Sequence, residues 1–137
     1  METVAKLFYE TIHTINAADY TPEQLNAWAP ETEKLKSRRD DLNNQNTLIA
    51  EIRGTIVGFG SIDKSGYLDL LFVHKDYQRQ GVAAALCDEL EKGFSVIKTY
   101  ASITAKPFFE NRGYVTVKAR EAECSGVKLR NYEMQKI

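Results

Sequence analysis

The sequence predicts one mixed α/β domain of the α+β type, with helices on both faces of a central sheet. Its first fifteen residues carry apolar side chains at every third or fourth position, which is typical of an amphipathic helix. An apolar run, Tyr67–Val73, has the pattern of a buried strand and leads through a glycine-bearing turn into an Ala/Leu-rich helix that begins at Val82. Hairpin patterns before and after this unit complete a mixed sheet.

Length and charge limit the classes of function. At 137 residues, the chain is long enough for a single domain with one sizeable core. Its formal net charge is −1, so no overall positive field attracts nucleic acid or an anionic membrane. The basic run Lys34–Arg39 is followed directly by Asp40 and Asp41. We interpret this run as a solvated helix face, with a nucleic-acid patch as the alternative, and expect no nucleic-acid partner.

The two cysteines, Cys87 and Cys124, lie far apart and have no metal-ligand spacing around them, so no metal site is expected. The sequence shows no signal peptide and no long apolar run. We therefore expect a reduced, cytoplasmic protein that does not associate with a membrane.

Residues 1–43 are predicted to be helical. Thr21, Pro22 and Glu23 form a helix start, with an N-cap, a proline at the first helical position and an acid in the first turn. The helices expected in this region span residues 1–15, 22–29 and 31–42.

Residues 47–137 are predicted to form the sheet and the core. Gly54 joins the first two strands into a hairpin, and Gly58 and Gly60 indicate a bend or a close backbone approach. Thr104 is the expected N-cap of the last helix, which Gly113 ends. The expected strands are 47–53, 55–62, 67–73, 95–102, 114–120 and 127–133, and the expected helices are 82–92 and 104–113.

The junction between strand 67–73 and the helix at Val82 has the features of an anion site. The first turn of a helix has free backbone N–H groups, and the helix dipole adds partial positive charge there. A glycine, Gly81, lies directly before this helix. Phosphate is the usual ligand of such a site, and a plain helix N-terminus is the alternative.

Two blocks of sequence resemble a known family. Gln78-x-x-Gly81-x-Ala83 fits the (Arg/Gln)-x-x-Gly-x-(Gly/Ala) signature of the GCN5-related N-acetyltransferases, the GNAT superfamily. Downstream, Ala105–Tyr114 is similar to the family's Ala-x-x-Phe-Tyr-x-x-x-Gly-Phe block. The resemblance covers Thr47–Ile137, and Tyr20–Trp28 is similar to one uncharacterised, small bacterial-type branch of the superfamily.

The resemblance implies the acyl-CoA N-acyltransferase fold, a mixed sheet in which two parallel strands splay apart. It implies an acetyl-CoA-dependent N-acetyltransferase that acetylates a primary amine of a small molecule or protein by direct attack in a ternary complex. Family members usually begin with a strand ahead of the first helix, and this sequence enters the helix at once. We therefore expect the strand Thr47–Arg53 at an open sheet edge, which together with the family suggests a homodimer.

By motif position, the resemblance also implies how acetyl-CoA is held. Pantetheine pairs with the main chain of the strand before the loop, and the pyrophosphate rests on N–H groups of the loop and helix start. Arg79 can add charge-assisted bonds to a phosphate, and a side chain at Gly81 would crowd it. The expected cofactor residues are Leu71, Phe72, Val73, Arg79, Gln80, Gly81, Val82, Ala83, Ala84, Ser102 and Phe108.

The catalytic groups are less evident. Where many family members have a tyrosine as general acid, this chain has Phe109, so Tyr100 and Tyr114 become the candidates, with packing as their alternative role. Asp69 is an acid in an apolar strand and is the candidate base, or else a structural group paired with backbone or a basic residue. Exchange of Asp69 for Asn is expected to lower turnover at least about tenfold if it is the base.

Acceptor binding in the family uses the first two helices and the closing hairpin. Tyr20 and Trp28 are therefore the candidate acceptor wall, although Trp28 also fits a plain core position. Glu23 and Glu31 lie near them and would favour a cationic amine. Because Phe109 has no proton to give and the first family strand is missing, a catalytically silent acyl-CoA-binding sensor or interaction module is the alternative function.

Overall fold

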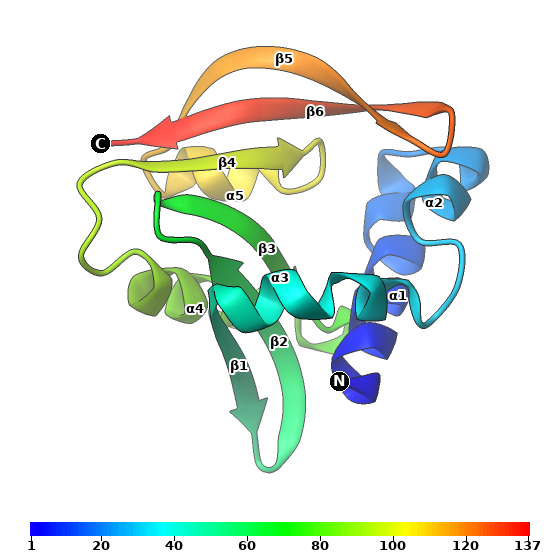
Figure 1. Ribbon diagram of the computed structural model, residues 1–137, viewed down its shortest axis with the longest axis horizontal. Helices are drawn as coiled ribbons and strands as arrows, with labels where there is room; N and C mark the ends of the chain where they lie inside the picture. The colour runs from blue at the N-terminus through cyan, green and yellow to red at the C-terminus, as the bar shows by residue number, and fades with distance from the viewer.

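The computed structural model describes all residues, 1–137, and shows a six-stranded mixed sheet between two groups of helices (Figure 1). The helices are α1 (Glu2–Thr14), α2 (Pro22–Trp28), α3 (Arg39–Asn44), α4 (Val82–Leu90) and α5 (Lys106–Asn111). Short 3₁₀ helices span Asn16–Ala18, Lys34–Arg38 and Lys75–Tyr77. The strands are β1 (Asn46–Ile52), β2 (Thr55–Ile62), β3 (Tyr67–Val73), β4 (Ile97–Ser102), β5 (Val115–Cys124) and β6 (Val127–Lys136). This architecture confirms the predicted fold class.

The strand order is β1-β2-β3-β4-β6-β5, and only β3 and β4 run parallel. The first strand, β1, lies at an open edge, as the sequence predicts, and exposes half of Ile49 to solvent. A two-residue turn, Arg53-Gly54, joins it to β2, and both residues have positive φ, which suits the right-handed twist of the strands.

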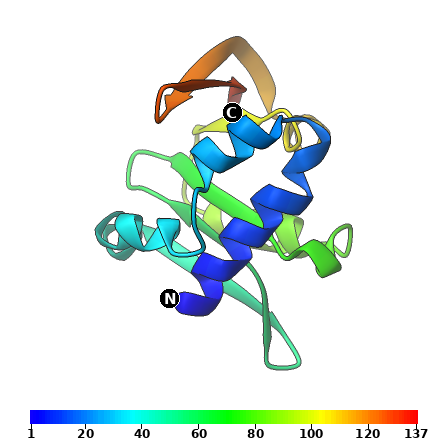
Figure 2. The same cartoon turned by 90° about the vertical axis from the view of Figure 1, so that its right-hand side faces the viewer.

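Each face of the sheet has its own core. The helices α1 to α3 cover one face, where Ile12, Leu35 and Phe59 are fully buried. The other face is covered by α4 and α5, where Leu90 and Met134 are fully buried. Figure 2 shows α1 crossing the sheet, with α2 near the β5–β6 hairpin. Helices thus cover both faces of the sheet. The candidate site lies in the middle of the sheet, where β3 and β4 separate.

The helix α4 lies directly on the glycines of β2. A Cβ on Gly58 would lie 2.9 Å from Val82, and one on Gly60 would lie 2.8 Å from Leu90. A side chain at either position would therefore crowd the side chains of α4, so the glycines mark a close approach of the helix side chains rather than of its backbone.

The structure confirms the predicted start of one helix and contradicts that of another. Thr21 accepts a hydrogen bond from the Gln24 N–H, and the Gln24 side chain accepts one from the Thr21 N–H, so α2 begins in a capping box. The third helix was placed too early: residues 34–38 form a 3₁₀ helix and the α-helix begins only at Arg39. No helix is both long and apolar enough to cross a lipid bilayer.

A partly buried carboxylate, Glu91, whose side chain is 10% exposed, fixes the C-terminal end of α4. It accepts hydrogen bonds from both Arg112 Nε and Nη2 at 2.9 Å, from the Tyr114 hydroxyl at 2.7 Å and from Lys136 Nζ at 3.2 Å. Burial alone would raise the pKa of Glu91, but these hydrogen bonds bring its pKa below the usual value. The cluster ties α4 to the residues that follow α5 and to β6.

We predict that Glu91→Gln destabilises the protein at neutral pH and that its deficit shrinks in acid. A carboxyl group whose pKa is lowered on folding stabilises the fold above its unfolded-state pKa of about 4.3, and this contribution is lost as pH falls through the folded-state pKa. Urea unfolding of both proteins between about pH 7 and pH 3 measures the difference. Glu89→Gln, an exposed change on the same helix, is the control. A deficit that stays constant down to pH 3 contradicts the assignment.

Candidate functional site

The parallel strands β3 and β4 part soon after they begin. Only Tyr67 with Lys98 and Leu68 with Thr99 are paired. Both strands continue beyond this point, β3 to Val73 and β4 to Ser102. The gap that results lies in the middle of the sheet and exposes main-chain groups on both sides.

A β-bulge at Asp69 explains where the pairing ends. Ile62 on β2 is paired with Leu68, and Ser61 is paired with Leu70, so Asp69 is the extra residue of the bulged strand. The bulge changes which residues turn their main-chain groups toward β2. Beyond it, the His74 N–H bonds to the Val57 carbonyl of β2.

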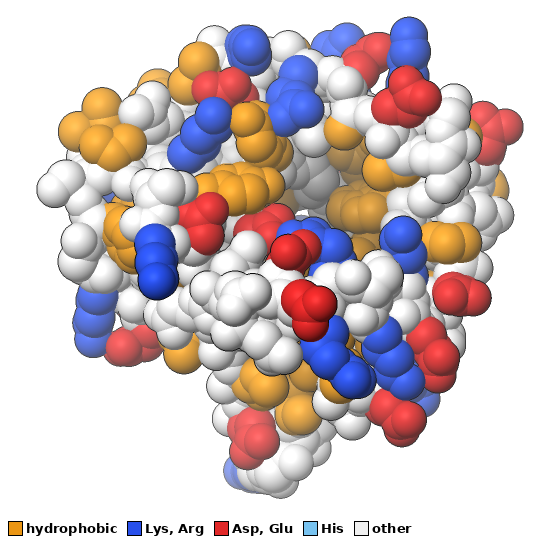
Figure 3. Space-filling model, in the orientation of Figure 1, with side chains coloured by type: hydrophobic (Ala, Val, Ile, Leu, Met, Phe, Trp, Pro, Cys, Tyr) orange, Lys and Arg blue, Asp and Glu red, His pale blue; other side chains and the backbone are white.

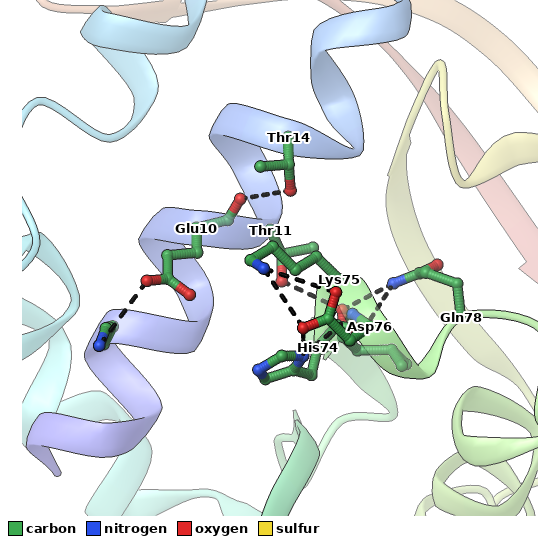
Figure 4. Close-up of polar contacts among 9 residues, drawn as sticks. Glu10, Thr11, Thr14, His74, Lys75, Asp76 and Gln78 are labelled. Atoms are coloured by element: carbon green, nitrogen blue, oxygen red, sulfur yellow. Dashed lines mark hydrogen bonds and ion pairs between the residues drawn. The ribbon is translucent and has the colours of Figure 1, made fainter.

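Because neighbouring residues on a strand face opposite sides, the main-chain groups of Leu71 and Val73 turn away from β2 and toward the gap. The Val73 carbonyl agrees with this direction. It accepts hydrogen bonds from Thr11 Oγ1 of α1 at 3.0 Å and from Gln78 Nε2 at 2.7 Å (Figure 4). By the same alternation, the main chain of Phe72 faces β2, where its partner is Phe59. Thr11 and Gln78 thus hold the end of β3, a role that the sequence analysis did not assign.

The loop after β3 leads to the N-terminus of α4 at the same gap. Arg79 and Gly81 both have positive φ, 61° and 81°, so the chain turns sharply just before Val82. A Cβ on Gly81 would meet no atom within 4 Å, so the fold requires glycine there for its backbone conformation. No side chain caps α4. Its first N–H groups are therefore free to bind an anion, as the sequence analysis proposes.

A cavity of about 1100 Å³ joins the gap, the loop and the space beneath the β5–β6 hairpin. Figure 3 shows the hollow on one face of the molecule, with acidic and basic side chains at its rim. Its volume slightly exceeds the usual range for ligand pockets, about 300–1,000 Å³, so it has room for a large ligand and a small one. The predicted site residues that line it are Tyr20, Trp28, Asp69, Leu71, Phe72, Val73, Arg79, Gly81, Val82, Ala83, Ala84, Tyr100, Ser102 and Phe108. Gln80 and Tyr114 are the two predicted residues outside it.

Tyr114 lies apart from the cavity. It is 3% exposed, and its hydroxyl donates to Glu91. Burial raises its pKa, and the bond to the Glu91 carboxylate raises it further. The structure therefore places this candidate acid in a packing role.

Tyr100 does reach the cavity, together with Tyr67, which the sequence analysis did not select. Their rings meet edge to face, with centres 5.7 Å apart. Burial and then the Asp69 charge raise the pKa of Tyr67 to about 12. Phe109 also lines the cavity, but only 3% of it is exposed, and its ring packs against that of Phe108, with ring centres 5.2 Å apart.

Asp69 is the only carboxylate that lines the cavity. Its side chain is 8% exposed and forms an ion pair with Arg38. The Gln45 amide donates to the same carboxylate oxygen at 3.0 Å. The acid of the apolar strand is thus paired with a basic residue from the helical region, and Arg38 itself joins the cavity lining.

Tyr20, a candidate acceptor residue, uses its hydroxyl group both as a hydrogen-bond donor and as an acceptor. Its hydroxyl donates to the Arg130 carbonyl at 2.6 Å and accepts from the Ile103 N–H at 2.9 Å. Burial raises its pKa. Trp28 packs edge to face against Tyr20, with ring centres 5.6 Å apart, and completes an aromatic wall.

Two expectations about polar side chains were wrong. Glu23 and Glu31 are exposed and do not line the cavity, so they supply no acidic wall for a cationic amine. Thr104 does not cap α5: its hydroxyl donates to Asp19 at 2.8 Å. The N-cap of α5 is Ala105, and no side chain caps the helix; the Ala105 N–H donates to the Ser102 hydroxyl oxygen at 3.1 Å.

Comparisons with known proteins agree with this geometry. The model of the family described as "Acetyltransferase (GNAT) domain" matches residues 16–136. The chain is 38% identical over 134 residues to the uncharacterized N-acetyltransferase YafP of Escherichia coli K12, and the match covers 98% of the chain and 87% of that protein.

Solved structures show the same fold. A GCN5-related N-acetyltransferase from Rhodopseudomonas palustris superposes with a TM-score of 0.92 at 36% identity, covering 97% of this chain and 86% of that one. The PaiA N-acetyltransferase of Thermoplasma acidophilum, solved with coenzyme A, gives a TM-score of 0.72 at 19% identity, covering 98% and 91%. The splayed strands, the uncapped α4 and these matches lead to one conclusion: the chain belongs to the GNAT superfamily and is an N-acetyltransferase.

Proposed function

We propose that the protein transfers the acetyl group of acetyl-CoA directly to a primary amine, with both substrates bound in the cavity at once. The observation that supports this most is the early end of β3–β4 pairing beside the uncapped N-terminus of α4. It provides main-chain groups for an extended amide-containing chain and N–H groups for a diphosphate, and coenzyme A has both parts.

The residues present fit acetyl-CoA. The N–H groups at the start of α4 and the Arg79 guanidinium suit the pyrophosphate, because both favour negative charge. The main-chain groups of Leu71 and Val73 suit the pantetheine amides. When bound, acetyl-CoA supplies a thioester, whose sulfur becomes the leaving group.

The chain must then do three things for transfer. An N–H group of β3 near the bulge polarises the thioester carbonyl. Asp69, the only carboxylate of the cavity, receives the proton of the amine, and the ion pair with Arg38 fixes its position. Tyr100 donates a proton to the departing thiolate, in place of the tyrosine that Phe109 replaces.

The silent acyl-CoA-binding module has one observation in its favour, the apolar Phe109 at the acid position. Tyr67 and Tyr100 place two phenols in the same cavity. Family membership and these phenols together favour the transferase.

We predict that Gly81→Glu abolishes acetyl-CoA binding, which we expect to be micromolar in the wild type. The new carboxylate would lie at the phosphate-binding turn and repel the pyrophosphate. Calorimetric titration of acetyl-CoA measures the affinity. Gly93→Glu is the matched control, because Gly93 also has positive φ and open space around it but lies after α4. Equal binding by both variants would contradict the assignment.

We predict that Asp69→Asn lowers kcat at least about tenfold, with acetyl-CoA affinity unchanged, because the amide cannot accept the amine proton. CoA release with an active amine is the assay, and Arg38→Gln is the companion variant. It keeps the carboxylate and removes its partner. If Asp69→Asn loses only thermal stability and keeps its kcat, the carboxylate has a structural role.

We predict that Tyr100→Phe lowers kcat about tenfold or more without weakening acetyl-CoA binding, because the leaving thiolate loses its proton donor. Tyr67→Phe tests the neighbouring phenol in the same assay. Tyr114→Phe serves as the control, and we expect it to reduce stability through the lost bond to Glu91 while kcat stays unchanged. An unchanged kcat in the Tyr67/Tyr100 double variant would exclude a tyrosine acid.

A further inference from the structure

A polar row crosses three neighbouring strands on the acceptor side of the cavity. Asn131 of β6 is paired with Ser102 of β4 on one side and with Arg120 of β5 on the other. Directly paired residues of antiparallel strands present their side chains on the same face. All three residues line the cavity, so the row forms part of its wall beneath the β5–β6 hairpin.

Arg120 in this row has no carboxylate partner in the chain. Its guanidinium stacks on the Tyr100 ring, 4.1 Å from the ring centre. The nearest row along the hairpin contains Glu133, whose carboxylate pairs with Lys98 at 3.9 Å and Lys118 at 4.0 Å. A stacked guanidinium keeps the N–H groups at its edge free, in the flat fork that matches a carboxylate.

Asn131 and Ser102, the other two members of the row, each have a hydrogen-bonding group that is not used within the protein. Asn131 Oδ1 is buried and has no hydrogen-bond partner. Ser102 Oγ accepts from the Ala105 N–H, which leaves its hydroxyl proton to donate. Since buried polar atoms in folded proteins are nearly always paired, this wall is suited to a polar ligand group.

The charge of the cavity points to an anionic group. Asp69 is the only carboxylate in the lining, and it is paired with Arg38, which also binds Asp41 outside the cavity. Arg120 therefore contributes an uncompensated positive charge in the half of the cavity opposite α4. A cationic part of an acceptor would be repelled there, whereas a carboxylate would gain charge-assisted hydrogen bonds.

Apolar residues adjoin the polar row. Ala122 and Cys124 follow Arg120 along β5, and Leu129 precedes Asn131 on β6. Trp28 faces the cavity from α2. An acceptor with its carboxylate on Arg120 would lay an apolar body against these side chains.

We infer that the acceptor is an amine that also carries a carboxylate, with an apolar body: the chemistry of an apolar amino acid. This inference rests on the proposed acetyl transfer and names its substrate class. Arg120 binds the carboxylate, Asn131 and Ser102 complete its polar surroundings, and the amino group is directed toward the thioester at the β3 bulge.

Matched amines test the inference. Wild-type protein with acetyl-CoA is assayed for CoA release with phenylalanine against phenethylamine and with leucine against isoamylamine, pairs that differ only in the carboxylate. We expect kcat/KM to be at least about tenfold higher for each amino acid, the effect of one charge-assisted contact. Higher or equal values for the amines without a carboxylate overturn the inference and leave the transferase function standing. Acetyl-CoA binding without transfer to either series overturns the transferase function, and the inference with it.

Variants of Arg120 test whether the polar row causes the preference for an acceptor with a carboxylate. Arg120→Leu should raise KM for the amino acid about tenfold or more and change kcat less, and the ratio of kcat/KM between the amino acid and its matched amine should fall toward one. Arg120→Lys should bind the amino acid more tightly than Arg120→Leu but less tightly than the wild type, because lysine keeps the positive charge and lacks the planar guanidinium. Lys118→Leu removes a positive charge from the same strand outside the cavity and is the control, with melting temperature and acetyl-CoA affinity measured for each variant. Equal KM values for the amino acid in the Arg120→Leu and Lys118→Leu proteins would exclude Arg120 as the carboxylate site.

Discussion

The early end of hydrogen bonding between β3 and β4 is the constraint on which the rest of the site depends. Two residue pairs hold these parallel strands together, and the bulge at Asp69 then turns the main chain of Leu71 and Val73 into the gap. Unpaired main-chain groups inside a sheet are costly unless something bonds them. Here Thr11 and Gln78 bond the Val73 carbonyl, and a ligand can take the others.

In the binding mode that we propose, the two halves of the cavity recognise ligands by different means. The half beside α4 uses main-chain groups and a helix N-terminus, so its side chains need only be small or apolar. The half beneath the β5–β6 hairpin uses side chains that the pairing of β4, β6 and β5 brings into one row. Such a division lets one cosubstrate be bound the same way across a superfamily while the acceptor half changes, because surface hairpin side chains vary freely.

The sequence predicted the elements around the cavity well because their signals are local. The strand Tyr67–Val73 has the predicted bounds, α4 begins at Val82, and the Thr21 cap is confirmed. The third helix was misplaced because Lys34–Arg38 carries few apolar residues, and only Leu35 is buried there. Thr104 was wrongly assigned as a cap because Asp19, 85 residues earlier in the chain, takes its hydroxyl.

By itself, the sequence determined the mixed fold and the glycine turn before α4, since each depends on short-range patterns of glycine, apolar residues and helix starts, and its two motif blocks indicated the GNAT superfamily. Only the tertiary structure decided which side chains share the acceptor half. The pairing of Asp69 with Arg38, the burial of Tyr114 against Glu91 and the row that joins Ser102, Asn131 and Arg120 all depend on strand register and helix packing. Contacts of this kind join residues that are far apart in the chain, and no local pattern specifies which of many polar residues will meet.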